Sequence, residues 1–163
     1  MQEFKDEFGN NPHLRNHVDF NGQMNVLVYQ YFKSDLLSLV DNYPPLPIEA
    51  RKKILKEVGL GLNDMHRKNW IHLGMQLLMY HSLINFFIDI KPNNVFLNWH
   101  VDERDQFHLS KVALGDMDCA LKLQGDNLLS HRIGNVMWRS PEGQLGKNIG
   151  KPSEVFSFAL LVC

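Results

Sequence analysis

The first clear pattern along the chain is a pair of β-rich runs. His17 to Phe20 and Met24 to Tyr31 are rich in residues that favour strands. They are separated by Asn21-Gly22, a pair that type I′ hairpin turns prefer because both turn positions take a positive φ. The pattern therefore predicts a β-hairpin.

Two helices are expected after this hairpin. Ser34 is suited to cap a short helix that runs through Val40, and the prolines at Pro44-Pro45 prevent its continuation. A longer helix is expected from Pro47 to about Arg67, because its apolar residues recur at helical spacing and so predict one buried face. These residues are Ile54, Leu55, Val58, Leu62 and Met65.

The second half of the chain adds short strands and a further helix. Asn94 to Leu97 and Lys111 to Leu114 are strand candidates around a polar loop, His100 to Asp105. Val155 to Cys163 is almost wholly apolar, which predicts an incomplete buried helix. A hairpin followed by helices and short strand pairs indicates the α+β class.

Composition and charge narrow the class of protein. The 163 residues are 44% hydrophobic and 21% charged, which is ordinary for a globular domain. With 17 basic against 18 acidic residues, no overall field attracts nucleic acid or anionic lipid, and neither is expected as a partner. The two cysteines, Cys119 and Cys163, are too few for a disulfide framework or a cysteine-based zinc site.

Targeting signals are also absent from the sequence pattern. The N-terminus has no apolar signal-peptide core, and the long uncharged run from Gly74 to Ile88 falls short of the roughly 20 residues that a membrane span needs. We expect a cytoplasmic or nuclear protein.

One polar stretch carries residues suited to phosphate chemistry. Asp89, Lys91 and Asn94 follow one another at i, i+2 and i+5 in a segment that Pro92 constrains. Phosphoryl transfer needs an oxygen acceptor for the attacking hydroxyl, a cation on the transferring phosphate and an oxygen ligand for magnesium. The stretch is a candidate site for this reaction, and taken alone it is also compatible with an ordinary polar turn.

The order of the surrounding motifs resembles the protein kinase family. The catalytic loop of that family runs H-R-D-L-K-P-x-N. His72-Leu73 stand at its His and Arg, and Asp89, Lys91 and Asn94 match its catalytic aspartate, its lysine and its metal-binding asparagine. Val112 to Asp116 is similar to the strand that leads into the D-F-G motif, with Asp116 as the magnesium aspartate.

Segments on both sides extend this resemblance over nearly the whole chain. Val26 to Phe32 resembles the strand and hinge that contact adenine, and Gly134 to Glu142 is similar to the end of the activation segment. Lys151 to Phe158 resembles the start of a large buried helix. The triplet Asp116-Met117-Asp118, with the two later segments, is similar to a group of kinase-like proteins from filamentous fungi.

The resemblance implies a partial protein-kinase-like fold of the α+β class. Residues 1–163 would form one partial kinase domain, with the end of the N-lobe and the hinge in 1–32 and the first, mainly helical part of the C-lobe in 33–163. The implied cofactors are ATP and Mg²⁺. The implied catalytic residues are Asp89 and Lys91, Asn94 and Asp116 are the implied metal ligands, and the implied nucleotide-binding residues are Tyr29, Gln30, Tyr31, Phe32, Lys91, Asn94 and Asp116.

Several departures from the family pattern bear on activity. The Gly-rich phosphate loop and the strand lysine have no match, so we expect this chain to be inactive alone. Leu73 replaces the arginine that pairs with a phosphorylated activation loop, and Asp118 replaces the glycine of D-F-G. Glu154 stands where an aspartate supports the catalytic loop from below.

The largest departure is an insertion, Gly74 to Ile88, which separates His72-Leu73 from Asp89 where the family has no residues. It is uncharged and largely apolar, whereas surface loops are usually polar. A family-specific loop is one explanation. The other, which we favour, is a translated intron whose removal would rejoin an aspartate codon and restore the family motif. We expect residues 74–88 to be absent from the working protein.

Two functions stay open at this point. Lys91 favours a serine or threonine acceptor, so the parent protein is expected to be a Ser/Thr kinase that acts on a protein substrate. The alternative is a pseudokinase that serves as a binding or scaffold module. Leu73, Asp118 and Glu154 favour it, because they depart from the pattern of the kinase motifs. The sequence does not determine the oligomeric state. The apolar hairpin face and the insertion predict poor solubility of the isolated chain.

Overall fold

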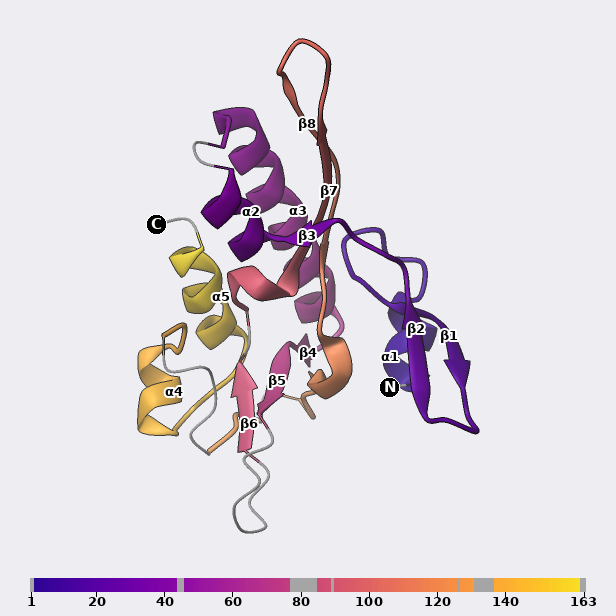
Figure 1. The fold of residues 1–163 in the computed structure, drawn as a ribbon. Coiled ribbons are helices and arrows are strands. Elements are labelled where there is room, and N and C mark those ends of the chain that lie inside the picture. Colours follow the sequence, from indigo (N-terminus) through magenta and orange to yellow (C-terminus); the bar gives the residue numbers. More distant parts are fainter. Residues whose placement is uncertain are drawn as a thin grey trace. The chain divides into compact units, whose positions relative to one another are not determined.

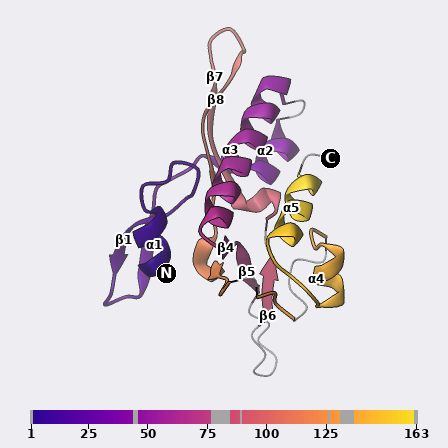
Figure 2. The same cartoon turned by 180° about the vertical axis from the view of Figure 1, so that it is seen from behind.

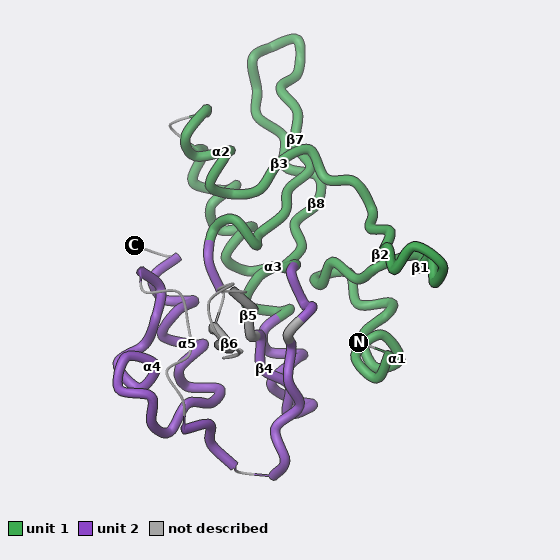
Figure 3. The backbone as a smooth tube through the Cα atoms, turned by 60° about the horizontal axis from the view of Figure 1, so that its bottom comes forward, with its two compact units in different colours: residues 1–61, 92–115 green, residues 62–91, 116–163 purple. Residues whose placement is uncertain are grey.

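The computed structural model describes residues 2–43, 46–76, 85–88, 90–125, 127–130 and 137–161, with the backbone alone for 73–76, 85–88 and 119. α-Helices and small antiparallel sheets alternate along the chain, which confirms the expected α+β class. The chain divides into two compact units, residues 1–61 with 92–115 and residues 62–91 with 116–163 (Figure 3). No helix within the described ranges is long and apolar enough to cross a membrane.

The first unit combines a β-hairpin with a three-stranded antiparallel sheet of strand order β3-β7-β8 (Figure 1). Helix α3 contributes its residues up to 61 to this unit and the rest to the other. The elements of the first unit are α1 (Gln2–Phe8), β1 (His17–Asn21), β2 (Val26–Tyr29), β3 (Ser34–Asp35), α2 (Leu36–Asn42), α3 (Ile48–Arg67), the 3₁₀ helix η1 (Pro92–Asn94), β7 (Val95–Val101) and β8 (Phe107–Leu114).

The predicted hairpin is confirmed, but its turn differs from the type I′ expectation. Asn21 pairs with Val26, so the loop comprises residues 22–25, and the positive φ of 50° falls on Asn25. The Asn21 side chain explains the longer turn, because its Oδ1 accepts hydrogen bonds from the backbone N–H groups of Gln23 and Met24 at 3.1 and 3.2 Å. Several apolar side chains of the hairpin are exposed: Val18, Phe20, Met24, Val26 and Val28.

The short helix is confirmed with a different cap. Asp35 rather than Ser34 is its N-cap, since the Asp35 carboxylate accepts from the backbone N–H of Ser38 at 2.9 Å and from its hydroxyl at 2.7 Å. Ser34 belongs to β3, and its hydroxyl accepts a hydrogen bond from the Trp99 indole N–H at 2.9 Å. The expectation for Ser34 was therefore wrong, because the helix begins one residue later, at Leu36, and the Ser34 hydroxyl bonds Trp99 instead.

The long helix and the strand pair follow the sequence pattern. Ile54, Val58, Leu62 and Met65 are buried along α3, while Leu55 is half-buried. β7 and β8 form the expected antiparallel pair and extend beyond it, which leaves a loop of residues 102–106. The chain segment before the hairpin lies along β8, because the backbone N–H of Arg15 donates to Leu114 O at 2.7 Å and the N–H of Leu114 donates to His13 O at 2.8 Å.

The second unit contains two small antiparallel pairs, β4-β9 and β5-β6, and two helices (Figure 2). A small core of Ile71, Leu123 and Ile149 packs with Leu129. The elements are the end of α3, then β4 (Trp70–Ile71), β5 (Leu73–Gln76), β6 (Asn85–Ile88), the 3₁₀ helix η2 (Met117–Cys119), β9 (Leu121–Lys122), α4 (Pro141–Leu145) and α5 (Lys151–Leu160).

The C-terminal segment forms the expected helix but not a buried apolar one. Val155 and Phe156 of α5 are 53% and 39% exposed, whereas Ser153, Glu154 and Ser157 are buried. The buried polar side chains have partners: the Ser157 hydroxyl donates to Trp138 O at 2.7 Å. The prediction of a buried helix was wrong for these residues because the face turned inward carries hydrogen-bonding groups rather than apolar ones.

The two ends of the insertion pair with each other. β5 and β6 are antiparallel, with Leu73 opposite Ile88 and Gln76 opposite Asn85. Residues 77–84 and Asp89 lie outside the described residues. Because opposite residues of an antiparallel pair lie about 4.5 to 5.5 Å apart at their Cα atoms, the chain leaves and re-enters the segment at nearly one place. Whether 74–88 belongs to the working protein stays a prediction.

Candidate functional site

Asn94, the implied metal ligand, is held rigidly in the first unit. It ends η1 directly before β7 and is 5% exposed. Its carbonyl oxygen accepts a hydrogen bond from the backbone N–H of Gly115 at 2.8 Å. A Cβ at Gly115 would lie 2.5 Å from the Phe96 ring, so any larger residue there requires that ring to move. The two segments therefore approach closely at Gly115.

Asp116 follows Gly115 in the sequence and belongs to the second unit. It is exposed and precedes η2 with φ 63° and ψ 50°, the left-handed conformation that aspartate tolerates better than most residues. Met117, which stands where D-F-G has phenylalanine, is buried at 3% exposure, and Asp118 is exposed. The Asp-Met-Asp triplet thus keeps one apolar anchor between two carboxylates that face water.

Lys91, a further catalytic candidate, lies in the second unit. Lys91 is half-buried and follows Ile90, which is fully buried. Asp89 lies outside the described residues, so its implied role as the catalytic aspartate stays a prediction. Of the activation segment, residues 134–136 also lie outside the description, whereas Ser140 caps α4 by accepting from the Gly143 N–H at 3.1 Å.

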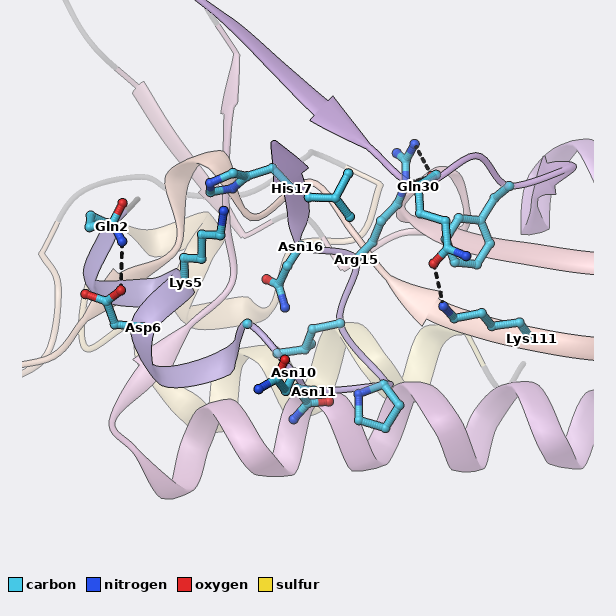
Figure 4. Close-up of a pocket in the computed structure, with 15 residues that line it drawn as sticks. Gln2, Lys5, Asp6, Asn10, Asn11, Arg15, Asn16, His17, Gln30 and Lys111 are labelled. Atoms are coloured by element: carbon cyan, nitrogen blue, oxygen red, sulfur yellow. Dashed lines mark hydrogen bonds between the residues drawn. The ribbon is translucent and has the colours of Figure 1, made fainter. Parts of the chain in front are cut away.

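The implied hinge follows β2 in the first unit. Tyr31 is 78% exposed and Phe32 is buried at 8%. The Gln30 carbonyl oxygen accepts hydrogen bonds from Nε and Nη2 of Arg15 at 3.3 and 3.2 Å, and its side-chain Oε1 accepts one from Lys111 at 2.7 Å (Figure 4). The hinge is thus anchored by cations from two other segments. Neither cation belongs to a motif in the sequence.

The buried carboxyl group of Glu154 contacts His66 and His72 in the second unit. The Glu154 carboxyl group is fully buried, lies 2.8 Å from Nε2 of His66 and receives a hydrogen bond from the His72 backbone. Its other oxygen, Oε1, is buried without a hydrogen bond among the described residues. The family motifs point to Glu154 and His72 but not to His66, although His66 continues the α3 stripe four residues after Leu62.

Burial drives this pair towards its neutral form. Desolvation raises the pKa of Glu154 well above its usual value, against the hydrogen bond from His72. Desolvation, aided by the nearby Lys151 ammonium, lowers the pKa of His66 to about 4. A protonated Glu154 that donates to Nε2 of a neutral His66 satisfies both shifts, because neither side chain then carries an uncompensated buried charge.

This pair predicts a pH dependence of stability. Above pH 6.5 histidine is neutral in both states and the unfolded Glu154 is ionised. As far as its raised pKa the folded Glu154 keeps its proton, so over that range the free energy of unfolding falls as the pH rises, by at most about 1.4 kcal/mol per pH unit. Between pH 4.5 and 6.5 this loss is offset, since unfolded His66 takes up a proton that folded His66 refuses.

Glu154→Gln is expected to remove the loss of stability above pH 6.5, because glutamine keeps a donor and an acceptor without titrating. Denaturant unfolding at several pH values between 6.5 and 8 measures the slope. Glu49→Gln is a matched control at an exposed pair, with Lys52, and should leave the slope unchanged. An equal slope in wild type and Glu154→Gln would show that Glu154 is already ionised in the fold.

A cavity of about 600 Å³ opens beside the hinge in the first unit. Figure 4 shows Lys5 and Asp6 on its α1 side and Arg15, Gln30 and Lys111 on its hinge side. Gln2 donates to the Asp6 carboxylate at 2.7 Å, so the acidic wall is itself hydrogen-bonded. The cavity is mostly polar and adjoins the residues implied to bind adenine.

The donor chemistry for magnesium is present. Among the described residues, no group of three or more His, Cys, Asp or Glu side chains could hold a metal ion. A magnesium ion in a nucleotide site needs only one or two protein carboxylates besides phosphate and water. The Asn94 amide oxygen and the Asp116 carboxylate are hard oxygen donors of the required kind, so each residue suits by its chemistry the ion that the resemblance implies.

No family model matches the chain. It is similar to serine/threonine-protein kinase A of Synechocystis, with 26% identity over 83% of this chain and 24% of that protein. It is also similar to cysteine-rich receptor-like protein kinase 6 of Oryza sativa, with 27% identity over 86% of this chain and 18% of that protein. U-box domain-containing protein 35 of Arabidopsis thaliana is 28% identical over 93% of this chain and 17% of its own length.

These similarities support a protein-kinase-like family for the chain. The kinase-like resemblance stated from the motifs is thus confirmed at this coarse level. The chain spans about a quarter or less of the length of these curated relatives.

Proposed function

We propose that this chain is the hinge and catalytic portion of a protein serine/threonine kinase, which transfers the γ-phosphate of ATP to a hydroxyl group of a protein substrate. Asp89 orients the acceptor hydroxyl, and Lys91 neutralises the γ-phosphate. Asn94 and Asp116 hold Mg²⁺, which when bound neutralises the phosphate charge. The hinge from Tyr29 to Phe32 seats adenine. Residues 1–32 then belong to the N-lobe and 33–163 to the C-lobe.

The observation that carries this proposal is the backbone hydrogen bond between Asn94 and Gly115. One backbone hydrogen bond of 2.8 Å joins the residue that offers the amide to the residue before Asp116. A Cβ at position 115 would lie 2.5 Å from the Phe96 ring, so glycine lets this segment pack closely against β7. Phosphoryl transfer depends on metal ligands that are held in place before the substrate binds, and a hydrogen-bonded junction of this kind supports that role.

Finer assignments follow from the same resemblance. Lys91 favours serine or threonine over tyrosine as the acceptor. The exposed Asp118 beside Asp116 keeps the fungal kinase-like group as the proposed subgroup, and a cytoplasmic or nuclear location is proposed with it. The alternative function is a pseudokinase that binds partners without transferring phosphate. The neutral His66–Glu154 pair favours that alternative, because a loop support without charge differs from the family's aspartate.

Mg²⁺-dependent ATP binding tests the proposed site. The protein to use is this chain joined to the segment that precedes the matched region in one of the curated kinases. Mg²⁺ is expected to tighten ATP binding by at least about tenfold, or about 1.4 kcal/mol, and Asp116→Asn or Asn94→Ala to abolish that gain. Calorimetric titration with and without Mg²⁺ measures it.

Asn93→Ala serves as the control for this titration, since Asn93 is the exposed neighbour of buried Asn94. It should keep the full Mg²⁺ effect. ATP binding that is equally strong with and without Mg²⁺ would contradict the proposed metal site. So would an effect of Mg²⁺ that survives both Asp116→Asn and Asn94→Ala.

A further inference from the structure

Arg15 stands beside the hinge on a fixed backbone. The residue is half-buried, and its N–H is bound to the carbonyl of Leu114 in β8. Leu14, its neighbour, is buried at 5% exposure and bridges to the same strand. The backbone at Arg15 is therefore fixed against β8, and the long side chain of Arg15 extends from it so that the guanidinium lies at the hinge (Figure 4).

The guanidinium of Arg15 makes two kinds of contact there. Its Nε and Nη2 both donate to the Gln30 carbonyl. Its central carbon lies 4.1 Å from the ring centre of Phe96, 5.1 Å from that of Tyr29 and 5.7 Å from that of Phe32. The centroids of the Phe32 and Phe96 rings are themselves 6.1 Å apart, so the cation lies within a cluster of aromatic rings.

Adenine and the Arg15 guanidinium bind to the same kinds of protein group. It is a planar group with an N–H donor at its edge and aromatic faces, and the proposed hinge offers a carbonyl acceptor and aromatic rings. The Arg15 guanidinium is also planar and rich in N–H donors. Both groups cannot use the Gln30 carbonyl and the Phe96 ring face together.

We propose that Arg15 occupies the adenine seat of this chain and must be displaced before a nucleotide base can bind. This inference rests on the proposed function, because it takes the hinge from Tyr29 to Phe32 as the seat. Arg15 thereby lowers the affinity for adenine compounds.

The adjoining cavity gives the displaced side chain a place to go. Arg15 lines this space of about 600 Å³, as do Asp6 and Asn16. Rotation about the side-chain bonds of Arg15 moves the guanidinium into the cavity without breaking its backbone hydrogen bond to Leu114. Burial already lowers the pKa of Arg15, so a move towards the Asp6 carboxylate and water relieves a desolvated cation. The seat can open without unfolding the hairpin.

Adenosine binding by the full chain tests the inference, because adenosine is uncharged and so does not respond to the loss of a positive charge alone. Arg15→Met keeps an unbranched apolar stem and removes the donors. It is expected to tighten adenosine binding by about tenfold or more, since hydrogen bonds and ring contacts of the guanidinium no longer compete. Ligand-observed NMR titration yields the dissociation constants.

Arg51→Met is the matched control. Arg51 also donates through Nε to a backbone carbonyl, that of Leu46 at 2.9 Å, but lies on α3 away from the hinge residues in sequence. It should leave adenosine affinity unchanged within about twofold, well under the 1.4 kcal/mol of a tenfold change. Arg15→Lys, which keeps the charge and loses the planar donors, is the second variant if Arg15→Met does not fold, and it should also tighten binding.

A direct readout follows the wild-type side chain. The Nε–H resonance of Arg15 is expected to move when adenosine saturates the protein, because the guanidinium leaves the aromatic rings. Equal adenosine binding by wild type and both Arg15 variants would overturn the inference and leave the proposed seat intact. Weaker binding by Arg15→Met would overturn it as well, since Arg15 would then stack with the base. If no variant binds adenosine, the proposed seat fails and the inference falls with it.

Discussion

Replacing Asp89 with asparagine is expected to lower the rate of phosphate transfer from Mg-ATP by at least about 100-fold, the lower end of what a positioned proton acceptor contributes. Asparagine has nearly the same shape but a neutral amide, so it no longer accepts the proton of the attacking hydroxyl. Initial rates with radiolabelled ATP measure the effect. The protein should carry a kinase small lobe at its N-terminus and lack residues 74–88.

Asp105→Asn is the matched control for this substitution. Asp105 lies in the loop between β7 and β8 with a φ of 59°, a conformation in which asparagine is tolerated as well as aspartate. Its rate should equal that of the parent. If Asp89→Asn also transfers phosphate at the parent rate, while both bind Mg-ATP, the enzymatic role of Asp89 is lost and the pseudokinase alternative takes its place.

Deleting residues 74–88 is expected to raise the rate of phosphate transfer by on the order of 100-fold. In the complete chain Leu73 pairs with Ile88 across β5-β6, whereas the deletion joins Leu73 directly to Asp89, as in the family motif. The insertion therefore places a strand pair where the motif has a single peptide bond. A displacement of about 1 Å at a reacting group costs about 100-fold in rate.

A second variant separates the loop from the spacing. Replacing only residues 77–84 by a short Gly-Ser turn keeps β5 and β6, and should leave the rate as low as in the complete chain. A deletion that abolishes folding or lowers the rate would show that the segment is a working part of the protein. Mature messenger RNA that contains the segment throughout would contradict the intron explanation as well.

Local pattern was enough to predict the main elements of the fold. The helical stripe of α3 and the pair β7-β8 depend on periodicity within a few residues, and the structure confirms both. The α+β class follows from their order. The motifs also led to the kinase-like family that the similar proteins support.

Contacts between residues that lie far apart in the sequence could not be predicted from local pattern. Ser34 and Asp35 are both good caps, and the distant Trp99 indole takes the Ser34 hydroxyl while Asp35 caps the helix. His66 and Glu154 lie 88 residues apart, so no local signal joined them. The inward face of α5 was predicted to be apolar, because its hydrogen-bond partners, such as Trp138 O, come from another segment.

The sequence names candidate site residues whose roles stay predictions, and it says nothing of their surroundings. The sequence named Asn94 and Asp116 from the family motifs, and the structure adds that the Asn94 carbonyl is bonded to Gly115. Arg15 carried no motif at all. Its place at the hinge depends on the bridge between Leu14 and Leu114, a pairing across 100 residues that periodicity does not encode.

The central claim is that this sequence carries the catalytic half of a Ser/Thr kinase. Phosphoamino-acid analysis after incubation with γ-labelled Mg-ATP and a mixture of serine, threonine and tyrosine peptides tests it most directly, in the chain joined to a kinase small lobe and freed of residues 74–88. The account predicts label on serine or threonine, dependent on Mg²⁺ and lost in Asp89→Asn. Mg-ATP binding without any transferred label, or label on tyrosine alone, would contradict it.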